Sequence, residues 1–474
     1  MSRTAMFISC AVGMALTCVF LAPASVRAAG PAFGTPSVTA ELGQQLTFSS
    51  TIDGDDIQSV DVLIHLEGNP TTVILNSGVQ INDEYQAQAD IDIASSAECA
   101  CLSPGITAPN THFDFQFRAT NSDGGTSLGP VAQGVFQDNR FQWQTLSEDQ
   151  VVVHWYAGDQ AFGKSAADVA NGAIDTASQL LGVTLDKPVD LFVYNTEDDM
   201  RSAISPDREN VAGEAHPDID TMYVWIPSDQ GAETFAGTLI RHELTHLVFH
   251  RAVDNPYNGV PRWLDEGTAV YLSEGYTSYW QGFVNDAVAN KTLIPLDGLS
   301  GLFPSVQSEF YLAYGEAVAA VDFFIRTYGD QTFWNLVKSY ANGVSDDEAF
   351  SAATGSDVEA FNSAWFQSLG LTPQSPVGPQ PGATGPLPPD WVGFDVPPTL
   401  SPYLPPPPGG PATVQPTQGT IGGVHETARP ASGSGNPAAG ASQSDPTSIL
   451  LILGLVVALI VGTFAVGVAL RGRS

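Results

Sequence analysis

The chain has 474 residues and a formal charge of -34, which arises from 51 acidic and 17 basic side chains. One ordinary domain of roughly 150 residues cannot account for this length, so about three units are expected. A surface with such an excess of carboxylates repels phosphates, which argues against nucleic acid as a partner.

The N-terminus has the layout of a secretory signal peptide. Arg3 precedes an apolar run over residues 5–22, and residues 26–28, within a stretch that is rich in small residues, fit a cleavage site. We therefore predict a signal peptide over residues 1–29. The alternative is an uncleaved anchor helix, and in both cases the body of the protein is exported.

Residues 30–140 alternate between apolar and polar side chains. The pattern is clearest over residues 60–66 and 113–117, and polar or glycine-rich turn clusters stand at residues 53–55 and 121–125. A period of two between turn clusters is typical of short antiparallel strands. The sequence predicts an all-β sandwich of the immunoglobulin or fibronectin type, although the immunoglobulin disulfide spacing is absent.

Only two cysteines follow the predicted signal peptide, Cys99 and Cys101. An exported compartment permits disulfides, and these two form the available pair. Whether they are bonded stays open.

Residues 141–372 mix strand-like and helical patterns. Strand-like runs at residues 151–156, 189–194 and 222–226 accompany a helical stretch at 161–181, and long helical patterns follow. Strands first and helices afterwards favour an α+β domain.

Residues 241–250 read RHELTHLVFH and contain the pattern H-E-x-x-H. His242 and His246 lie one helical turn apart on the same face, so both imidazoles can reach one metal ion. Glu243 lies about 100° round the helix, beside the ligands. This arrangement suits a base that acts on zinc-bound water during attack on a carbonyl.

A second amphipathic stretch, residues 261–271, reads PRWLDEGTAVY and places Glu266 twenty positions after His246. Catalytic zinc often takes two histidines and one glutamate and leaves its fourth position for water. The combination of H-E-x-x-H with a W-L-x-E-G helix resembles the gluzincin clan, and in particular its peptidase MA-like members, relatives of thermolysin and of the large aminopeptidases. The resemblance covers about residues 141–369.

The resemblance implies a zincin domain with one zinc ion and the following ligands: His242, His246 and Glu266. It also implies that Glu243 is the general base and acid. Asp265 is less attractive as a ligand, because the family pattern places the ligand directly before the glycine. His250, one turn beyond the second histidine, is interpreted as an exposed polar residue at the helix end.

The segment at residues 310–317 resembles the helix that carries the catalytic tyrosine in the aminopeptidase relatives. Tyr314 occupies the matching position for stabilising the oxyanion, and Tyr311 is the reserve. Ala317 stands where those relatives commonly have glycine. A core aromatic is the alternative interpretation of Tyr314.

In this clan an edge strand pairs with an extended peptide substrate, and the strand at residues 222–226 is expected to fill that place. Residues 213–216, Gly-Glu-Ala-His, are expected to line the cleft, with His216 a loop residue and not a second metal ligand. The G-x-M-E-N motif that grips a free amino terminus in the aminopeptidases is absent.

The last hundred residues show no pattern of a globular domain. Residues 373–446 hold more than half of the chain's 34 prolines and predict an extended, disordered stalk. A ligand for a proline-recognising domain is the alternative interpretation. Residues 447–470 are apolar and long enough to span a bilayer, and the basic tail at 471–474 predicts a cytoplasmic C-terminus.

Together these features predict a multidomain, single-pass protein of the cell membrane with its N-terminal domains outside the cell. The leading hypothesis for its function is a zinc metallopeptidase that hydrolyses peptide bonds in peptide or protein substrates. The alternative is a cell-surface binding or adhesion protein on a catalytically silent peptidase scaffold. A third hypothesis is that the sandwich is the functional module and the peptidase processes its own chain. The sequence indicates no oligomeric state.

Overall fold

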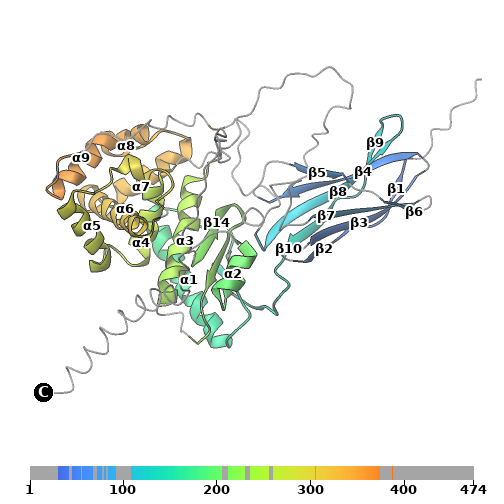
Figure 1. Cartoon of the computed structure of the whole chain (residues 1–474), viewed down its shortest axis with the longest axis horizontal. Coiled ribbons are helices and arrows are strands. Elements are labelled where there is room, and N and C mark those ends of the chain that lie inside the picture. The colour runs from blue at the N-terminus through green and yellow to red at the C-terminus, as the bar shows by residue number, and fades with distance from the viewer. Residues whose placement is uncertain are drawn as a thin grey trace, which may run out of the picture. The chain divides into compact units, whose positions relative to one another are not determined.

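The structure is a computed structural model of the whole chain (Figure 1). It describes residues 30–41, 45–54, 56–67, 72–76, 79–81, 84–91, 108–204, 212–229, 235–255, 260–304, 306–373 and 387. The predicted signal peptide, Cys99 and Cys101, nearly all of the predicted stalk, the predicted transmembrane helix and the basic tail lie outside these ranges. Inside them, no helix combines the length and the apolar character that crossing a membrane requires.

The N-terminal part forms two antiparallel sheets. The first sheet consists of β1 (Ala32–Phe33), β2 (Ser37–Glu41), β3 (Gln45–Asp53), β6 (Val79–Ile81) and β7 (Glu84–Ile91). The second consists of β4 (Ile57–Leu66), β5 (Thr72–Asn76), β8 (Thr111–Asn121), β9 (Thr126–Leu128) and β10 (Ala132–Phe136). The all-β character agrees with the alternating pattern, whereas the immunoglobulin or fibronectin type stays a prediction.

Aromatic side chains join the two sheets. Phe48 of the first sheet packs edge-on against Phe113 and Phe115 of the second, with ring centroids 5.8 and 5.0 Å apart. Asp61 and Arg118 are opposite each other in the β4–β8 register, and Arg118 Nε donates to Asp61 Oδ2 at 2.9 Å. Both are buried, so the polar face of these strands is partly covered as well.

The second half begins with a mixed sheet in the order β11-β12-β13-β15-β14. Its strands are β11 (Gln144–Glu148), β12 (Val151–Trp155), β13 (Val189–Tyr194), β15 (Thr221–Trp225) and β14 (Gly213–His216). β12, β13 and β15 run parallel, and the two outer strands run antiparallel to their neighbours. The predicted strands at 151–156, 189–194 and 222–226 are thus present to within one residue at each end.

One expectation about this sheet is wrong. The strand at residues 222–226 corresponds to β15, which is bonded on both sides, to β13 and to β14. Among the described strands, β14 is at this edge of the sheet. The order of strands depends on pairing between distant segments, which local periodicity does not record.

Helices make up the rest of the described chain. They are α1 (Gln160–Leu181), α2 (Glu197–Ile204), α3 (Phe235–Val253), α4 (Arg262–Ser273), α5 (Ser278–Asn290), α6 (Gln307–Tyr328), α7 (Asp330–Ser339), α8 (Asp346–Thr354) and α9 (Val358–Ser368). Asp159 caps the start of α1, where its side chain accepts a hydrogen bond from Phe162 N. Gly182 caps the end with a left-handed backbone conformation. α3 contacts both α1 and α4, and α4 contacts α6.

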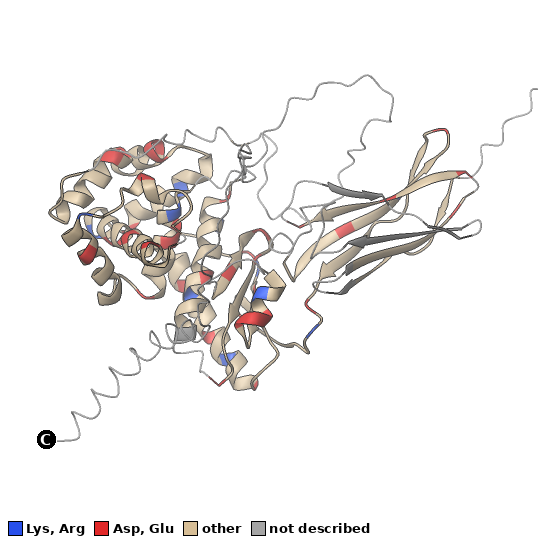
Figure 2. Cartoon of the chain, viewed as in Figure 1, with Lys and Arg blue, Asp and Glu red and all other residues tan. Residues whose placement is uncertain are grey.

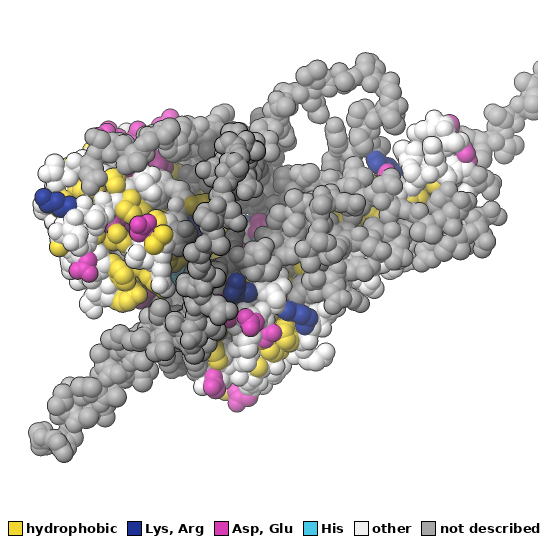
Figure 3. All heavy atoms as spheres, viewed as in Figure 1, with side chains coloured by type: hydrophobic (Ala, Val, Ile, Leu, Met, Phe, Trp, Pro, Cys, Tyr) yellow, Lys and Arg dark blue, Asp and Glu magenta, His cyan; other side chains and the backbone are white. Residues whose placement is uncertain are grey.

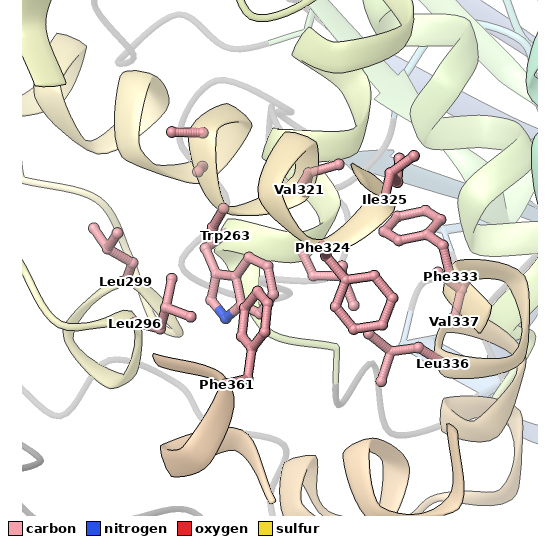
Figure 4. Packing of buried hydrophobic residues seen from close by; sticks show 14 of the residues in the cluster. Trp263, Leu296, Leu299, Val321, Phe324, Ile325, Phe333, Leu336, Val337 and Phe361 are labelled. Atoms are coloured by element: carbon pink, nitrogen blue, oxygen red, sulfur yellow. The ribbon is translucent and has the colours of Figure 1, made fainter. Parts of the chain in front are cut away.

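The core of the helical part fixes the position of α4 (Figure 4). Trp263, at the start of α4, is fully buried and stacks on Phe361 of α9 with ring centroids 6.1 Å apart. On the next turn, a Cβ added to Gly267 would lie 2.5 Å from the carbonyl oxygen of Ala317 in α6. Only glycine permits this approach of the two helices, so the residues between Trp263 and Gly267 are held firmly toward α3.

Candidate metal centre

Helix α3 presents two imidazoles on one face. The Nε2 atoms of His242 and His246 are 3.2 Å apart, with ring centroids 4.9 Å apart and the rings nearly perpendicular. The i,i+4 spacing of the sequence therefore brings both nitrogens to one point, as predicted.

Helix α4 brings a carboxylate to the same point. Glu266 Oε2 lies 3.4 Å from His242 Nε2 and 3.5 Å from His246 Nε2. Together with the 3.2 Å between the nitrogens, these distances form a nearly equilateral triangle. Four ligands placed tetrahedrally at about 2.05 Å from a zinc ion would be about 3.3 Å apart, so the triangle has the dimensions of one face of a zinc tetrahedron.

The state of the carboxylate also fits a cation. Glu266 is 6% exposed, and its Oε2 atom is buried without a hydrogen-bond partner in the described part of the chain. A buried carboxylate oxygen that faces two imidazole nitrogens is a costly arrangement unless a positive charge joins it. Within the described ranges, these three side chains form a group able to hold a metal ion.

Further polar contacts orient two of the three groups, His246 and Glu266. Asp265 Oδ1 is 2.7 Å from His246 Nδ1, which directs the Nε2 atom of that ring to the triangle. Arg262 Nη2 donates to Glu266 Oε1 at 2.7 Å and leaves Oε2 to face the histidines. Sequence reasoning overlooked Arg262, although its i,i+4 spacing to Glu266 is the signal that would have found it.

His250 differs from its expected state. Its side chain is 25% exposed and half-buried, and its Nε2 atom lies 3.2 Å from Asp265 Oδ2. His250 is in the last turn of α3, as expected, but it is not exposed, because Asp265 of α4 lies against its ring. Asp265 bridges two histidines, one inside the triangle and one outside it.

The charges of the site are strongly coupled. Burial by itself would raise the pKa of Glu266, but the adjacent imidazoles of His242 and His246 lower it overall. Burial likewise opposes ionisation of Asp265, while His246 and His250 keep its pKa below the usual range. Both carboxylates are therefore ionised at neutral pH.

Glu243 is next to the triangle without belonging to it. The residue is 7% exposed, and burial raises its pKa while the two neighbouring histidines partly oppose the rise. A Cβ on Gly213 of β14 would lie 2.7 Å from Glu243 Cγ, so the bare backbone of β14 packs directly on this side chain. The carboxylate is held at the wall of a cavity of about 760 Å³.

Both candidate tyrosines line this cavity. The Tyr314 ring packs on Phe310 at 4.9 Å between centroids and is 6.4 Å from His242. Burial raises the pKa of Tyr314, and the charge of Glu266 raises it further. The Tyr311 ring instead stacks on a neighbouring phenylalanine, Phe283, at 5.9 Å.

The edge strand β14 also lines the cavity, through Gly213, Glu214 and Ala215. His216 is the last residue of β14 and not a loop residue, so that expectation is corrected. Its Nε2 atom lies 3.2 Å from Glu214 Oε1. Glu274 is a further carboxylate of the lining that sequence reasoning did not single out.

Comparison with known proteins places part of the chain in a known context. Residues 169–370 match the model of the peptidase MA superfamily. Among solved structures, the chain is similar to an M1 zinc metallopeptidase from Deinococcus radiodurans at 13% identity and a TM-score of 0.35, over 75% of this chain and 96% of that chain. It is similar to an aminopeptidase N family protein from Idiomarina loihiensis at 12% identity and a TM-score of 0.33, over 71% and 73%. No curated protein matches the chain.

Proposed function

Through residues 169–370 the chain belongs to the peptidase MA superfamily, and on this premise we propose that it is a zinc-dependent peptidase that hydrolyses peptide bonds. The observation that carries the proposal is the triangle of two imidazole nitrogens and one carboxylate oxygen, with sides of 3.2, 3.4 and 3.5 Å. His242, His246 and Glu266 would hold one zinc ion. When bound, zinc would supply a Lewis acid that polarises the substrate carbonyl and makes a coordinated water more acidic.

The side chains around the triangle have separate tasks in this proposal. Glu243 accepts a proton from the attacking water and later delivers it to the leaving amine. The Tyr314 hydroxyl donates a hydrogen bond to the oxygen that gains negative charge as the carbonyl is attacked. Asp265 and Arg262 orient the ligands, and the edge strand β14 offers its backbone to an extended peptide.

The location of the enzyme is a further part of the proposal and comes from the sequence. The signal peptide over residues 1–29 exports the chain, and the apolar run over residues 447–470 anchors it in the cell membrane. Residues 373–446 act as a spacer between the folded part and the bilayer. The substrates are then peptides or proteins outside the cell.

The test compares the full-length chain with Glu243→Gln and with the control Glu359→Gln, an exposed glutamate of α9. We expect about one zinc ion per chain in all three proteins and chelator-sensitive cleavage of a peptide library by the wild type. Glu243→Gln should lose about 1,000-fold in kcat, which is the contribution of one general base.

Three outcomes would contradict the proposal. The wild type could contain no zinc, it could cleave no peptide with zinc bound, or Glu243→Gln could bind zinc, lose cleavage and still preserve the cellular role. The last outcome would favour a binding protein on a silent scaffold.

A further inference from the structure

One carboxylate of the cavity stands apart from the metal triangle. Glu274 directly follows Ser273, the last residue of α4, and its backbone N–H bonds to Val270 O as the C-cap of the helix. Glu274 is exposed and lines the cavity. A negative charge at a helix C-terminus is unfavourable, because the helix dipole already places negative charge there. Local helix stability therefore does not explain an acidic residue at this position.

Among the carboxylates of the cavity, only Glu274 and the proposed base Glu243 have no ion pair with a described residue. Glu266 is bonded to Arg262, Asp265 lies between two histidines, and Glu214 is 3.2 Å from an imidazole. Glu274 forms no ion pair with any described residue. Burial of part of the side chain raises the pKa of Glu274, and a hydrogen bond from Trp280 and the charge of His242 oppose the rise.

Two aromatic side chains line the same cavity as Glu274. Trp280, in the first turn of α5, is 7% exposed, and the ring of Tyr311 comes from α6. Both line the cavity with Glu274. Leu302, which is 84% exposed, adds an apolar residue to the lining. Hydrophobic side chains are also exposed on the face of the helical part that Figure 3 shows. Aromatic and apolar walls accept the alkyl stem of a long side chain, and aromatic rings also attract a cation at its end.

We propose that Glu274, Trp280 and Tyr311 form a basic-residue pocket, which binds the side chain of a lysine or arginine next to the scissile bond. This inference rests on the proposed peptidase function and adds the substrate class. The ammonium or guanidinium group meets the Glu274 carboxylate, and the stem lies against the two rings. Acidic residues are spread over the described elements, in keeping with the net charge of -34, and their charge favours the approach of such substrates (Figure 2).

The experiment uses full-length protein and peptides that are identical except at one position. Each position flanking the cleavage site carries in turn lysine, norleucine or glutamate, so that norleucine keeps the stem and removes the charge. The proteins are the wild type, Glu274→Gln, Glu274→Lys and the control Glu359→Gln. The control also removes one negative charge, but from the first turn of α9, far from Glu274 in the sequence.

At one of the flanking positions, the wild type should cleave the lysine peptide with a kcat/KM roughly fivefold above that of the norleucine peptide, the effect of one partly exposed ion pair. Glu274→Gln should abolish this ratio, and Glu274→Lys should reverse it in favour of glutamate. Glu359→Gln should keep it. All four proteins should retain zinc, because Glu274 is not one of the three ligands.

The inference is overturned if the wild type cleaves lysine and norleucine peptides equally at every position. It is also overturned if the preference survives unchanged in Glu274→Gln, which would assign it to the general negative charge. Cleavage without a lysine preference leaves the peptidase function standing, whereas zinc-loaded wild type that cleaves no peptide refutes that function and the pocket together.

Discussion

The contact between Gly213 and Glu243 permits a change that moves the proposed base without touching any metal ligand. In Gly213→Ala the new Cβ would lie 2.7 Å from Glu243 Cγ, 2.8 Å from Oε1 and 3.0 Å from Cδ. Carbon atoms in contact normally stay about 3.5 Å apart, so the glutamate has to move by about 1 Å. Because Glu243 is 7% exposed and lines the cavity, the shift changes where its carboxylate lies in the site.

A displacement of about 1 Å at a reacting group can cost about 100-fold in rate. We therefore expect kcat of Gly213→Ala to fall about 100-fold, while zinc content stays at the wild-type level because His242, His246 and Glu266 are not displaced. The assay is cleavage of a fluorogenic peptide, with zinc measured on the same sample and with thermal unfolding as a check on folding.

The matched control is Gly172→Ala in α1, where an added Cβ meets nothing within 4 Å. It should keep full activity and gain slightly in stability, because alanine favours a helix over glycine. If Gly213→Ala retained wild-type kcat, the position of Glu243 would not matter for the reaction. If it lost zinc in proportion to activity, the substitution would act through the ligands, and the reasoning would be refuted.

Three further predictions concern the packing and charges around the site. Gly267→Ala should lower the free energy of unfolding by about 3 kcal/mol in urea titrations, because its Cβ would lie 2.5 Å from Ala317 O and force α4 and α6 apart. Burial raises the pKa of Glu316 above its ordinary 4.5, so the folded chain keeps this proton where the unfolded chain releases it, and stability falls as pH rises from 4.5 toward the folded-state pKa. Glu316→Gln, which can still accept from Ile294 N, should remove this part of the pH dependence in unfolding measured from pH 4 to 9. Asp265→Asn should weaken zinc binding by about tenfold or more in chelator competition, since the neutral amide holds the His246 ring less firmly.

The metal triangle could be predicted partly from a local rule and partly from the family resemblance. Two histidines at i and i+4 face the same way on any helix, so the approach of His242 and His246 follows from spacing alone. Glu266 is on a second helix, and no rule of periodicity brings two helices together. Glu266 could be predicted as the third ligand only through the resemblance of the W-L-x-E-G segment to the family.

The features that sequence reasoning missed or placed wrongly depend on contacts between distant segments. β14 and β15 have equally short strand patterns, and only the pairing of β15 with β13 makes β14 the edge strand. The half-buried state of His250 depends on Asp265, which is fifteen residues away on another helix. Glu274 carries no motif, and it becomes noticeable only when the cavity and its aromatic walls are known.

The residues from Arg262 to Gly267 in α4 show why one short helical segment can contain so many residues that the site requires. Successive residues of a helix point about 100° apart, so neighbours in the sequence serve different sides of the structure. Trp263 is fully buried in the helical core, Asp265 bonds to a histidine of α3, and Glu266 points its free oxygen to the two imidazoles. Arg262 bonds to the other oxygen of Glu266 one turn away, and Gly267 allows the backbone of α6 to approach. Since each position meets a different requirement, a substitution at any of them should fail in its own way: Trp263 and Gly267 through unfolding, and Arg262, Asp265 and Glu266 through the metal.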